Sequence, residues 1–185
     1  MKKNFGAKTW LYPMLVFIIA TYDKDGTPDA MNAAWGGIVD YGHIGLCLSA
    51  SHKTTKNILS RKAFTVGIAD AKNTVAGDYV GLVSANDTPD KLKRSGFTVT
   101  KSEFVDAPVI NEIPMVLECE YVKTTEDGIV VGKIVNVGAD KSVLGADGKI
   151  DPAKLRPITF DPVNNKYIAL GEITGNAFSD GKKLK

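Results

Sequence analysis

Short runs of apolar and β-branched residues, separated by turn sequences, constrain the fold of this chain more than any other feature. One run extends from Leu15 to Tyr22 and leads into the turn sequence Asp23-Lys24-Asp25-Gly26. Two more runs, Pro114 to Thr125 and Ile129 to Gly138, flank Glu126-Asp127-Gly128, which predicts a β-hairpin. The sequence contains no repeated β-α-β unit and no G-x-G-x-x-G motif, so it does not match a Rossmann sheet. We therefore predict a mostly β fold, an antiparallel barrel with peripheral helices.

A few helices are expected to cover this barrel. The first extends from Lys53 to Ser60. Residue types that favour helix N-caps mark three further starts, at Asn73, at Asp87 or Thr88, and at Asp151. In the helix after Asn73, the side chains of Val75, Tyr79 and Leu82 are spaced as one helical face.

Length and composition indicate an ordinary globular protein. A chain of 185 residues can bury a sizeable core without disulfides, so residues 1–185 are expected to form a single domain. Hydrophobic residues make up 44% of the sequence and charged residues 24%, which is typical of a folded chain. The formal charge of +2 is spread along the sequence without a basic tract, which argues against a nucleic-acid partner.

Cysteine usage and hydropathy point to a cytoplasmic protein. Cys47 and Cys119 both lie in apolar, strand-like runs without C-x-x-C spacing, so we expect two buried thiols in a reducing compartment. The longest wholly apolar run, Met14 to Ala20, is too short to span a bilayer. The first residues do not resemble a signal peptide, so no membrane association is expected.

The segment from Asp29 to Asn57 is the strongest candidate for a ligand site. Its first part carries Asn32, Ala33, Ala34 and Trp35. An amide in a strand interior must be paired, either with backbone or with the polar edge of a ligand. The two alanines leave space beside the sheet that a helix or a ligand must fill. Trp35 is by itself more typical of a core, so these residues indicate a ligand only in combination with the second part of the segment.

A corner rich in hydroxyl groups comes after the next predicted strand and forms this second part. It contains Ser49, Ser51, His52, Lys53 and Thr54. Ser51 or Thr54 is the expected N-cap of the helix that begins here. Free N–H groups at a helix start favour a phosphate, and Lys53 can add a charge-assisted bond. An ordinary capped helix with a solvated lysine is the alternative interpretation.

Other chemistries find little support. His43 and His52 are too few and too isolated to predict a metal site. The sequence has no G-x-S-x-G nucleophile elbow. Glu118 and Glu120 alternate with apolar residues, so both are expected on the solvated face of a strand.

At these residues the chain resembles the flavin-reductase-like FMN-binding proteins of the split-barrel fold, and flavoredoxin-like members in particular. The resemblance rests on an ordered set of segments that covers nearly the whole chain. They are Thr21–Gly26, Asn32–Trp35, Lys53–Ile58, Phe64–Ile68, Asp90–Leu92, Leu117–Cys119, Val131–Val135 and Tyr167–Glu172. No segment is specific alone, but their order along the chain is.

The resemblance implies a homodimeric split barrel that binds FMN at the subunit interface. It places Asn32, Ala33 and Ala34 against the polar edge of the flavin ring, with Trp35 packed nearby. It assigns the ribityl chain and phosphate to a second set, Ser49, Ser51, His52, Lys53 and Thr54, with Lys91 approaching from the following helix. Since the flavin N5 accepts a hydride directly, no catalytic residue of the chain is predicted. Phe160, Tyr167 and Phe178 are further candidates to shield a ring, although packing in a core or interface is their commoner role.

Two activities are compatible with this family. The first is an NAD(P)H-dependent flavin reductase, and the second is an electron carrier of the flavoredoxin type that exchanges electrons with redox protein partners. Asp127-Gly128-Ile129 stands where many members have a histidine associated with the ring or nicotinamide side, and its absence counts against direct NAD(P)H oxidation. FAD is the alternative flavin, and pyridoxal phosphate or haem are weaker alternatives for the pocket.

Overall fold

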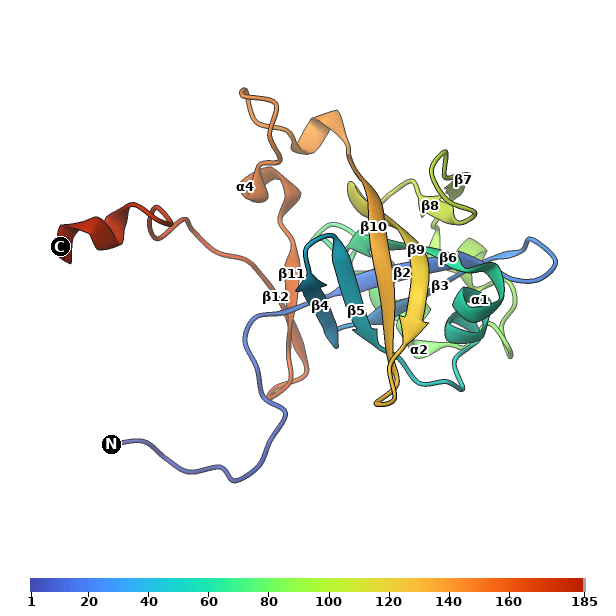
Figure 1. The fold of residues 1–185 in the computed structure, drawn as a ribbon, viewed down its shortest axis with the longest axis horizontal. Coiled ribbons are helices and arrows are strands. Elements are labelled where there is room, and N and C mark those ends of the chain that lie inside the picture. The colour runs from blue at the N-terminus through green and yellow to red at the C-terminus, as the bar shows by residue number, and fades with distance from the viewer. Residues whose placement is uncertain (185) are drawn as a thin grey trace.

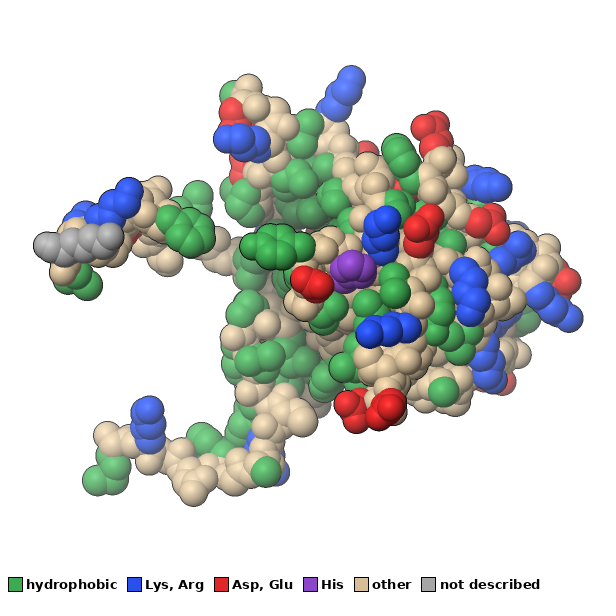
Figure 2. All heavy atoms as spheres, in the orientation of Figure 1, with side chains coloured by type: hydrophobic (Ala, Val, Ile, Leu, Met, Phe, Trp, Pro, Cys, Tyr) green, Lys and Arg blue, Asp and Glu red, His purple; other side chains and the backbone are tan. Residues whose placement is uncertain are grey.

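The computed structural model describes residues 1–184 and consists of a compact body with two extended terminal segments (Figure 1). Both segments leave the body on the same side. We call residues 1–13 the N-terminal arm and residues 170–184 the C-terminal arm; the latter ends in the 3₁₀ helix η2 (Asp180–Leu184). Apolar side chains on the arms, such as Leu11, Ile173 and Phe178, are exposed. Figure 2 shows further hydrophobic side chains on the side of the body from which the arms leave.

The body is built on a seven-stranded sheet with the order β3-β2-β6-β9-β10-β5-β4. Its strands are β2 (Phe17–Tyr22), β3 (Pro28–Ala33), β4 (Gly36–Asp40), β5 (His43–Cys47), β6 (Ala63–Ile68), β9 (Met115–Thr124) and β10 (Ile129–Ala139). Every neighbouring pair is antiparallel. The hairpin predicted across Glu126-Asp127-Gly128 is confirmed, with Gly128 at φ +83° in the turn.

The connection between β3 and β4 makes this sheet a split barrel. The two strands lie at opposite edges of the sheet, yet only Ala34 and Trp35 separate them in sequence. So short a link spans about 10 Å at most, so the sheet must curl until its edges approach one another there. The backbone N–H of Cys47 donates to the carbonyl of Trp35 at 2.8 Å and ties the link to β5. The predicted antiparallel split barrel is therefore confirmed, and its opening lies at Ala34 and Trp35.

Strand β2 is apolar from Phe17 to Ala20 because both of its faces are buried there. Phe17 and Ile19 point into the barrel core with Phe64 and Leu46. The alternate residues, including Ile18, belong to a second core under the helices. Successive side chains of a strand point to opposite faces, so a strand between two cores needs apolar residues at every position.

The helices lie outside the barrel. They are α1 (Lys53–Arg61), α2 (Thr74–Leu82), α3 (Lys91–Ser95) and α4 (Pro152–Leu155), with the 3₁₀ helix η1 (Lys141–Val143). The helix predicted after Asn73 is confirmed as α2, in which Val75 and Leu82 are exposed while Gly77 and Val80 are buried. The chain packs α2 through its small residues, which allows a closer approach to the sheet than a face of large side chains would.

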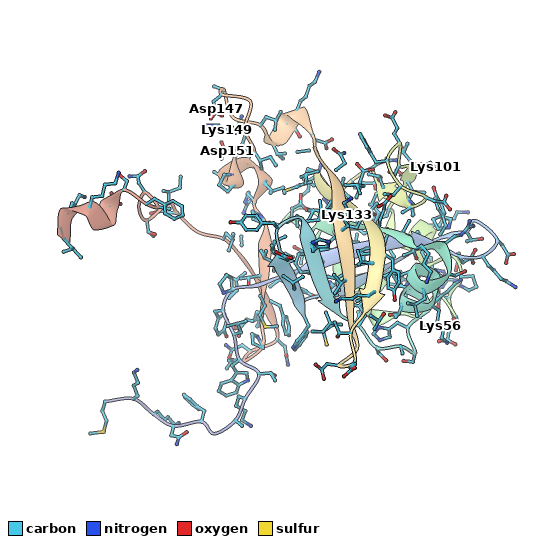
Figure 3. The ribbon with its side chains drawn as sticks, viewed as in Figure 1. Lys56, Lys101, Lys133, Asp147, Lys149 and Asp151 are labelled. Atoms are coloured by element: carbon cyan, nitrogen blue, oxygen red, sulfur yellow. The ribbon has the colours of Figure 1, made fainter. Side chains whose placement is uncertain are left out.

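Two helix starts also differ from the sequence prediction. His52, rather than Ser51 or Thr54, occupies the N-cap of α1 and makes no side-chain cap bond. α3 begins at Lys91, after the residues expected to cap it. By contrast, Asp151 caps α4 as predicted and accepts a bond from the Ala153 N–H at 2.8 Å. Figure 3 shows Asp151 in the same outlying loop region as Asp147 and Lys149, away from the barrel.

Two small sheets complete the fold. One is the hairpin β7 (Val99–Lys101) with β8 (Pro108–Ile110). The other joins β1 (Met14–Leu15), β11 (Ile158–Asp161) and β12 (Lys166–Ala169). This second sheet carries the chain from both arms onto the open side of the barrel.

Glu118 is not on a solvated face, so that prediction was wrong. It is only 5% exposed, whereas Glu120 is exposed as expected. The Glu118 carboxylate accepts hydrogen bonds from Ser102 and from Asn136 Nδ2. A buried carboxylate needs such donors. One of them, Ser102, lies between β7 and β8 and is 16 positions from Glu118 in sequence.

The two cysteines differ. Cys119 is buried as predicted, but Cys47 is exposed, which corrects the expectation of two buried thiols. Cys47 is the last residue of β5, where the strand reaches the barrel opening. Among residues 1–184 no helix is long and apolar enough to cross a membrane.

Candidate functional site

An aromatic cleft lies at the barrel opening. Its volume is about 270 Å³, and it is lined by Met31, Asn32, Ala33, Ala34, Trp35, Cys47, Leu48, His52, Phe160 and Tyr167. The small side chains of Ala33 and Ala34 leave the space, and aromatic rings from the small sheet border it. The structure thus brings together Asn32 through Trp35 and His52, as the sequence predicted.

The aromatic rings form one connected group along this cleft. The centroid of Trp35 lies 6.1 Å from that of Phe160, which lies 6.2 Å from that of Tyr167. Trp35 remains 47% exposed, so its ring is available to a ligand and is not sealed in the core. Tilted aromatic pairs at these distances are favourable contacts and hold the rings in place.

A polar cleft of about 280 Å³ adjoins the aromatic cleft. Met31, Asn32 and His52 line both, so the two clefts meet at these residues. The polar cleft also has Lys53, Thr54, Ser84 and Lys91 in its lining, together with the end of α2 and the residues that follow it. Three further predicted residues, Lys53, Thr54 and Lys91, therefore share one cavity.

The N-terminus of α1 opens toward this polar cleft. The first N–H groups of a helix have no partner within the helix. In the described chain, no side chain caps α1 and no acidic residue occupies its first turn. The Lys53 ammonium lies 3.3 Å from Asp23 Oδ2, and its side chain is 22% exposed. Such a helix start with a lysine beside it suits an anion.

The hydroxyl groups of the remaining predicted residues, Ser49, Ser51 and Thr54, are less directly available to a ligand in the clefts. Ser49 and Ser51 are exposed, and their hydroxyls are 2.8 Å apart. Neither residue lines the two clefts, although both immediately precede α1. Thr54 donates its hydroxyl to Asp29 Oδ2 at 2.7 Å. Its side-chain proton is thus committed to the protein, which leaves its backbone N–H as the group nearest the helix start.

Lys91 is buried, in contrast to the solvated lysine that is usual in a first helical turn. Its Nζ donates to the carbonyls of Val80 and Val83 at 3.2 and 3.1 Å and lies 3.2 Å from Asp29 Oδ1. The contact with Asp29 is an ion pair without hydrogen-bond geometry. Lys91 lies at the wall of the polar cleft, where it holds the end of α2 against β3.

Tyr167 is the most perturbed titratable group in the clefts. Burial raises its pKa to about 12, and its hydrogen bond to Asp78 acts in the same direction. The hydroxyl donates to Asp78 Oδ1 at 2.7 Å and lies 3.4 Å from Asn32 Nδ2. Tyr167 therefore stays a neutral hydroxyl at ordinary pH.

Comparison with known proteins decides the family. Residues 9–156 match the family model described as flavin reductase like domain. The chain belongs to the flavin reductase like domain family.

Solved structures agree with this assignment. Flavoredoxin of Desulfovibrio vulgaris (Miyazaki F) superposes with a TM-score of 0.94 at 38% identity, over 98% of this chain and 100% of that one. Flavoredoxin from Methanosarcina acetivorans gives a TM-score of 0.89 at 27% identity over the full length of both chains. A curated relative from Aeropyrum pernix, an uncharacterised protein, is 25% identical over 120 residues, which are 64% of this chain and 45% of that protein. The matched region thus spans less than half the length of that relative.

Some cleft residues of this flavin reductase-like domain were not recognised in the sequence. Met31 and Leu48, which line the aromatic cleft, were not singled out, and Cys47 was expected to be buried. Asp78, which accepts the hydrogen bond of Tyr167, was not singled out either. For Tyr167, packing in a core or interface was predicted ahead of contact with a ligand ring. Its distance in sequence from Asn32, 135 positions, shows why no local pattern could join them.

Proposed function

We propose that this protein is an FMN-binding oxidoreductase that works through a flavin held in the two joined clefts. The flavin ring occupies the aromatic cleft beside Asn32, Ala33, Ala34 and Trp35. The phosphate lies in the polar cleft near the N-terminus of α1. The observation that carries this proposal is the junction of an aromatic cleft with an anion-binding helix start in a member of a flavin reductase like family.

The residues present fit a phosphorylated planar ring. Together the two clefts fall within the range of about 300–1,000 Å³ that is usual for cofactor sites. Apolar and aromatic side chains surround the aromatic cleft, and the polar cleft supplies N–H donors and the Lys53 ammonium. This separation of apolar and anion-binding chemistry matches FMN, whose ring and phosphate lie at opposite ends of the molecule.

Each predicted residue has a binding role in this proposal. Lys53, His52 and the first-turn N–H groups of α1 hold the phosphate, with Ser49 and Ser51 at the approach to the helix. Lys91 supports the wall of the polar cleft. When bound, the flavin supplies the redox chemistry. The chain positions it and limits access of water, so we assign no catalytic residue.

Two electron donors are compatible with this site. In the first, the protein oxidises NADH or NADPH as a flavin reductase. In the second, it carries electrons between protein partners, as the name of its 38% identical neighbour, flavoredoxin, suggests. We favour the second because the turn at Asp127-Gly128-Ile129 lacks the histidine that many family members place there. FAD remains the alternative flavin.

We further propose that the protein is a homodimer in the cytoplasm. The arms and the barrel opening expose large apolar side chains, among them Leu11, Ile38 and Val39, and these residues line a hollow of about 670 Å³ next to Trp35. Apolar patches of this kind are typical of interfaces. A second copy covering this hollow would also bury the open side of the aromatic cleft.

The experiment uses the full-length protein and free FMN. We expect the purified protein to be yellow or to quench FMN fluorescence with a 1:1 stoichiometry per chain. Lys53→Ala should weaken FMN binding about tenfold or more, since charge-assisted bonds to phosphate are strong, whereas Lys56→Ala, on the exposed side of α1, should leave it unchanged. Failure of the wild-type protein to bind FMN would refute the proposal.

Anaerobic reduction separates the two activities. Bleaching of the bound flavin by NADH or NADPH within seconds would identify a flavin reductase. Reduction by a ferredoxin system without a response to either nucleotide would identify the electron carrier that we favour. Sedimentation of the same samples measures the oligomeric state.

A further inference from the structure

The side chain of Asn32 is held in one orientation by groups from two distant elements. Asn32 lies on β3, is half-buried, and lines both clefts at the point where they meet. Its Nδ2 donates to the backbone carbonyl of Gly77 in α2 at 3.1 Å and to the hydroxyl of Tyr167 in β12 at 3.4 Å. Both N–H bonds of the amide therefore point into the protein.

The chemistry of these partners fixes the direction of each bond. The Gly77 carbonyl can only accept a hydrogen bond. The Tyr167 hydroxyl gives its single proton to Asp78 Oδ1 at 2.7 Å, because a carboxylate can only accept. The Tyr167 oxygen is then left as an acceptor toward Asn32. An amide turned the other way would set its Oδ1 against two acceptors, so Asp78 and Tyr167 determine which end of Asn32 faces the clefts.

The other end of the amide is free. Among residues 1–184, Asn32 Oδ1 has no hydrogen-bond partner, and it is absent from the polar atoms that are buried without one. It is therefore accessible at the junction of the two clefts. A fixed and accessible carbonyl oxygen at this point presents a single acceptor to any ligand.

Close packing of α2 keeps this arrangement rigid. A Cβ placed on Gly81 would lie 2.7 Å from Asn32 Cβ, and one on Gly77 would lie 3.2 Å from Ile18 Cδ1. The two glycines thus let the helix backbone approach β3 closely enough for the Gly77 carbonyl to reach the amide. Tyr167 lies outside the part of the chain that matches the family model, residues 9–156.

We propose that Asp78 and Tyr167 are positioning residues that lock Asn32 with Oδ1 toward the ligand, so that the site selects a hydrogen-bond donor on the flavin nucleotide. This inference rests on the proposed function. Oxidised FMN has its donors at ring N3–H and at the ribityl hydroxyls, while the other polar atoms of the ring edge accept. A ligand that covers this acceptor without offering it a donor leaves it buried and unpaired, and that penalty is how the site discriminates.

Two flavin analogues test the inference in the full-length protein. In 3-methyl-FMN the N3–H donor is blocked, and in 2′-deoxy-FMN a ribityl hydroxyl is removed. We expect the wild type to bind at least one of them about tenfold more weakly than FMN, and the analogue that is rejected identifies the donor. Fluorescence quenching gives the three dissociation constants.

Tyr167→Phe is the decisive variant. It removes one of the two acceptors that hold the Asn32 amide and leaves the Gly77 carbonyl as the single remaining one, so we expect FMN affinity to fall several-fold and the preference for FMN over the rejected analogue to shrink to about twofold. Tyr41→Phe is the matched control, because Tyr41 is fully exposed in the β4–β5 turn, and it should behave as the wild type. The Asn32 side-chain NH₂ signals in ¹H–¹⁵N spectra report the lock without ligand: they should exchange slowly in the wild type and faster in Tyr167→Phe.

The outcomes are distinguishable. Equal binding of all three flavins by the wild type, or full discrimination retained by a folded Tyr167→Phe, would overturn the inference and leave the proposed function standing. If Tyr167→Phe does not fold, Asp78→Asn gives the second test, because an asparagine can donate back to the tyrosine oxygen and unlock the amide; unchanged discrimination there overturns the inference. Absence of binding to all three flavins would remove the proposed function and the inference with it.

Discussion

The ammonium of Lys91 lies 3.2 Å from Asp29 Oδ1, and the two side chains are only 4% and 1% exposed. Lys91 also donates to the carbonyls of Val80 and Val83, while Thr54 donates to the second oxygen of Asp29. Four elements, β3, α1, α2 and α3, are thus joined at one buried point beside the polar cleft. A charge left alone at this point would lack both water and a partner.

Lys91→Met should therefore destabilise the fold strongly. The substitution leaves the Asp29 carboxylate buried without its cation, and loss of one partner of a buried pair costs about 3–5 kcal/mol. Urea denaturation followed by circular dichroism measures the effect. Lys93→Met provides the control, because Lys93 is exposed on the same helix, and should change stability by less than about 0.5 kcal/mol.

The double variant Lys91→Met/Asp29→Asn should recover part of this loss. With both charges removed, no uncompensated charge remains, and Thr54 can still bond to the new amide. A double-mutant cycle gives the coupling energy directly. Additive effects of the two single substitutions would show that the pair does not stabilise the fold.

Gly81→Ala should disturb the contact of α2 with Asn32. In an open helix this substitution would be favourable by about 1 kcal/mol. Here the new Cβ would lie 2.7 Å from Asn32 Cβ, so the helix must move and the bond from Asn32 to the Gly77 carbonyl lengthens. We expect a loss of about 1–3 kcal/mol in stability and several-fold weaker FMN binding. Gly171→Ala is the control, since no described atom lies within 4 Å of its added Cβ.

The two thiols should differ in reactivity. Burial raises the pKa of Cys119 to about 12, with Glu118 acting in the same direction, so its reactive thiolate is scarce at pH 8. Cys47 is exposed and lines the aromatic cleft. Titration with a disulfide reagent should find one fast thiol in the native protein and two after denaturation.

Substitution and ligand both check the identity of the fast thiol. Cys47→Ser should abolish the fast phase, while Cys119→Ser should leave it in place. Saturating FMN should slow the reaction of Cys47, because the proposed ring position covers it. A fast phase that persists in Cys47→Ser would contradict this assignment.

Acid should loosen the N-terminal arm. The hydrogen bond from Tyr12, together with one from Asn164, lowers the pKa of Asp161 to about 2, below the value near 3.9 of an unfolded aspartate. A depressed folded-state pKa adds stability above about pH 4, and this stability is lost as the pH falls toward 2. Hydrogen exchange at the Met14 amide, corrected for its intrinsic rate, should rise over this window.

Tyr12→Phe tests the cause of that pH dependence. Without the tyrosine hydroxyl, the arm should exchange faster already at pH 5 and show a flatter profile below it. Lys2→Ala, at an exposed position of the same arm, serves as the control. An unchanged acid profile in Tyr12→Phe would mean that Asp161 does not hold the arm.

The local part of the fold could be predicted from the sequence. The continuous apolar run before Asp23 predicted a strand, and the turn glycines located the hairpins at Gly26 and Gly128. Asn32 through Trp35 and the start of α1 were predicted as one site. Their residue types, small and aromatic in the first part and hydroxyl-bearing or basic in the second, indicate a ligand within one short segment. Errors arose where burial depended on a partner remote in sequence, as for Glu118 beside Ser102.

The sequence by itself determined the main hairpin strands and their turns, the family resemblance and the site residues from Asn32 to Trp35 and at the start of α1, because periodicity and residue type act over a few neighbouring positions. Only the tertiary structure decided that Lys91 is paired with Asp29 and that Tyr167 and Asp78 orient Asn32. Those contacts depend on how the sheet curls and on which chain end returns to the barrel opening. Their energies come from burial and hydrogen-bond direction between distant segments, which no local pattern encodes.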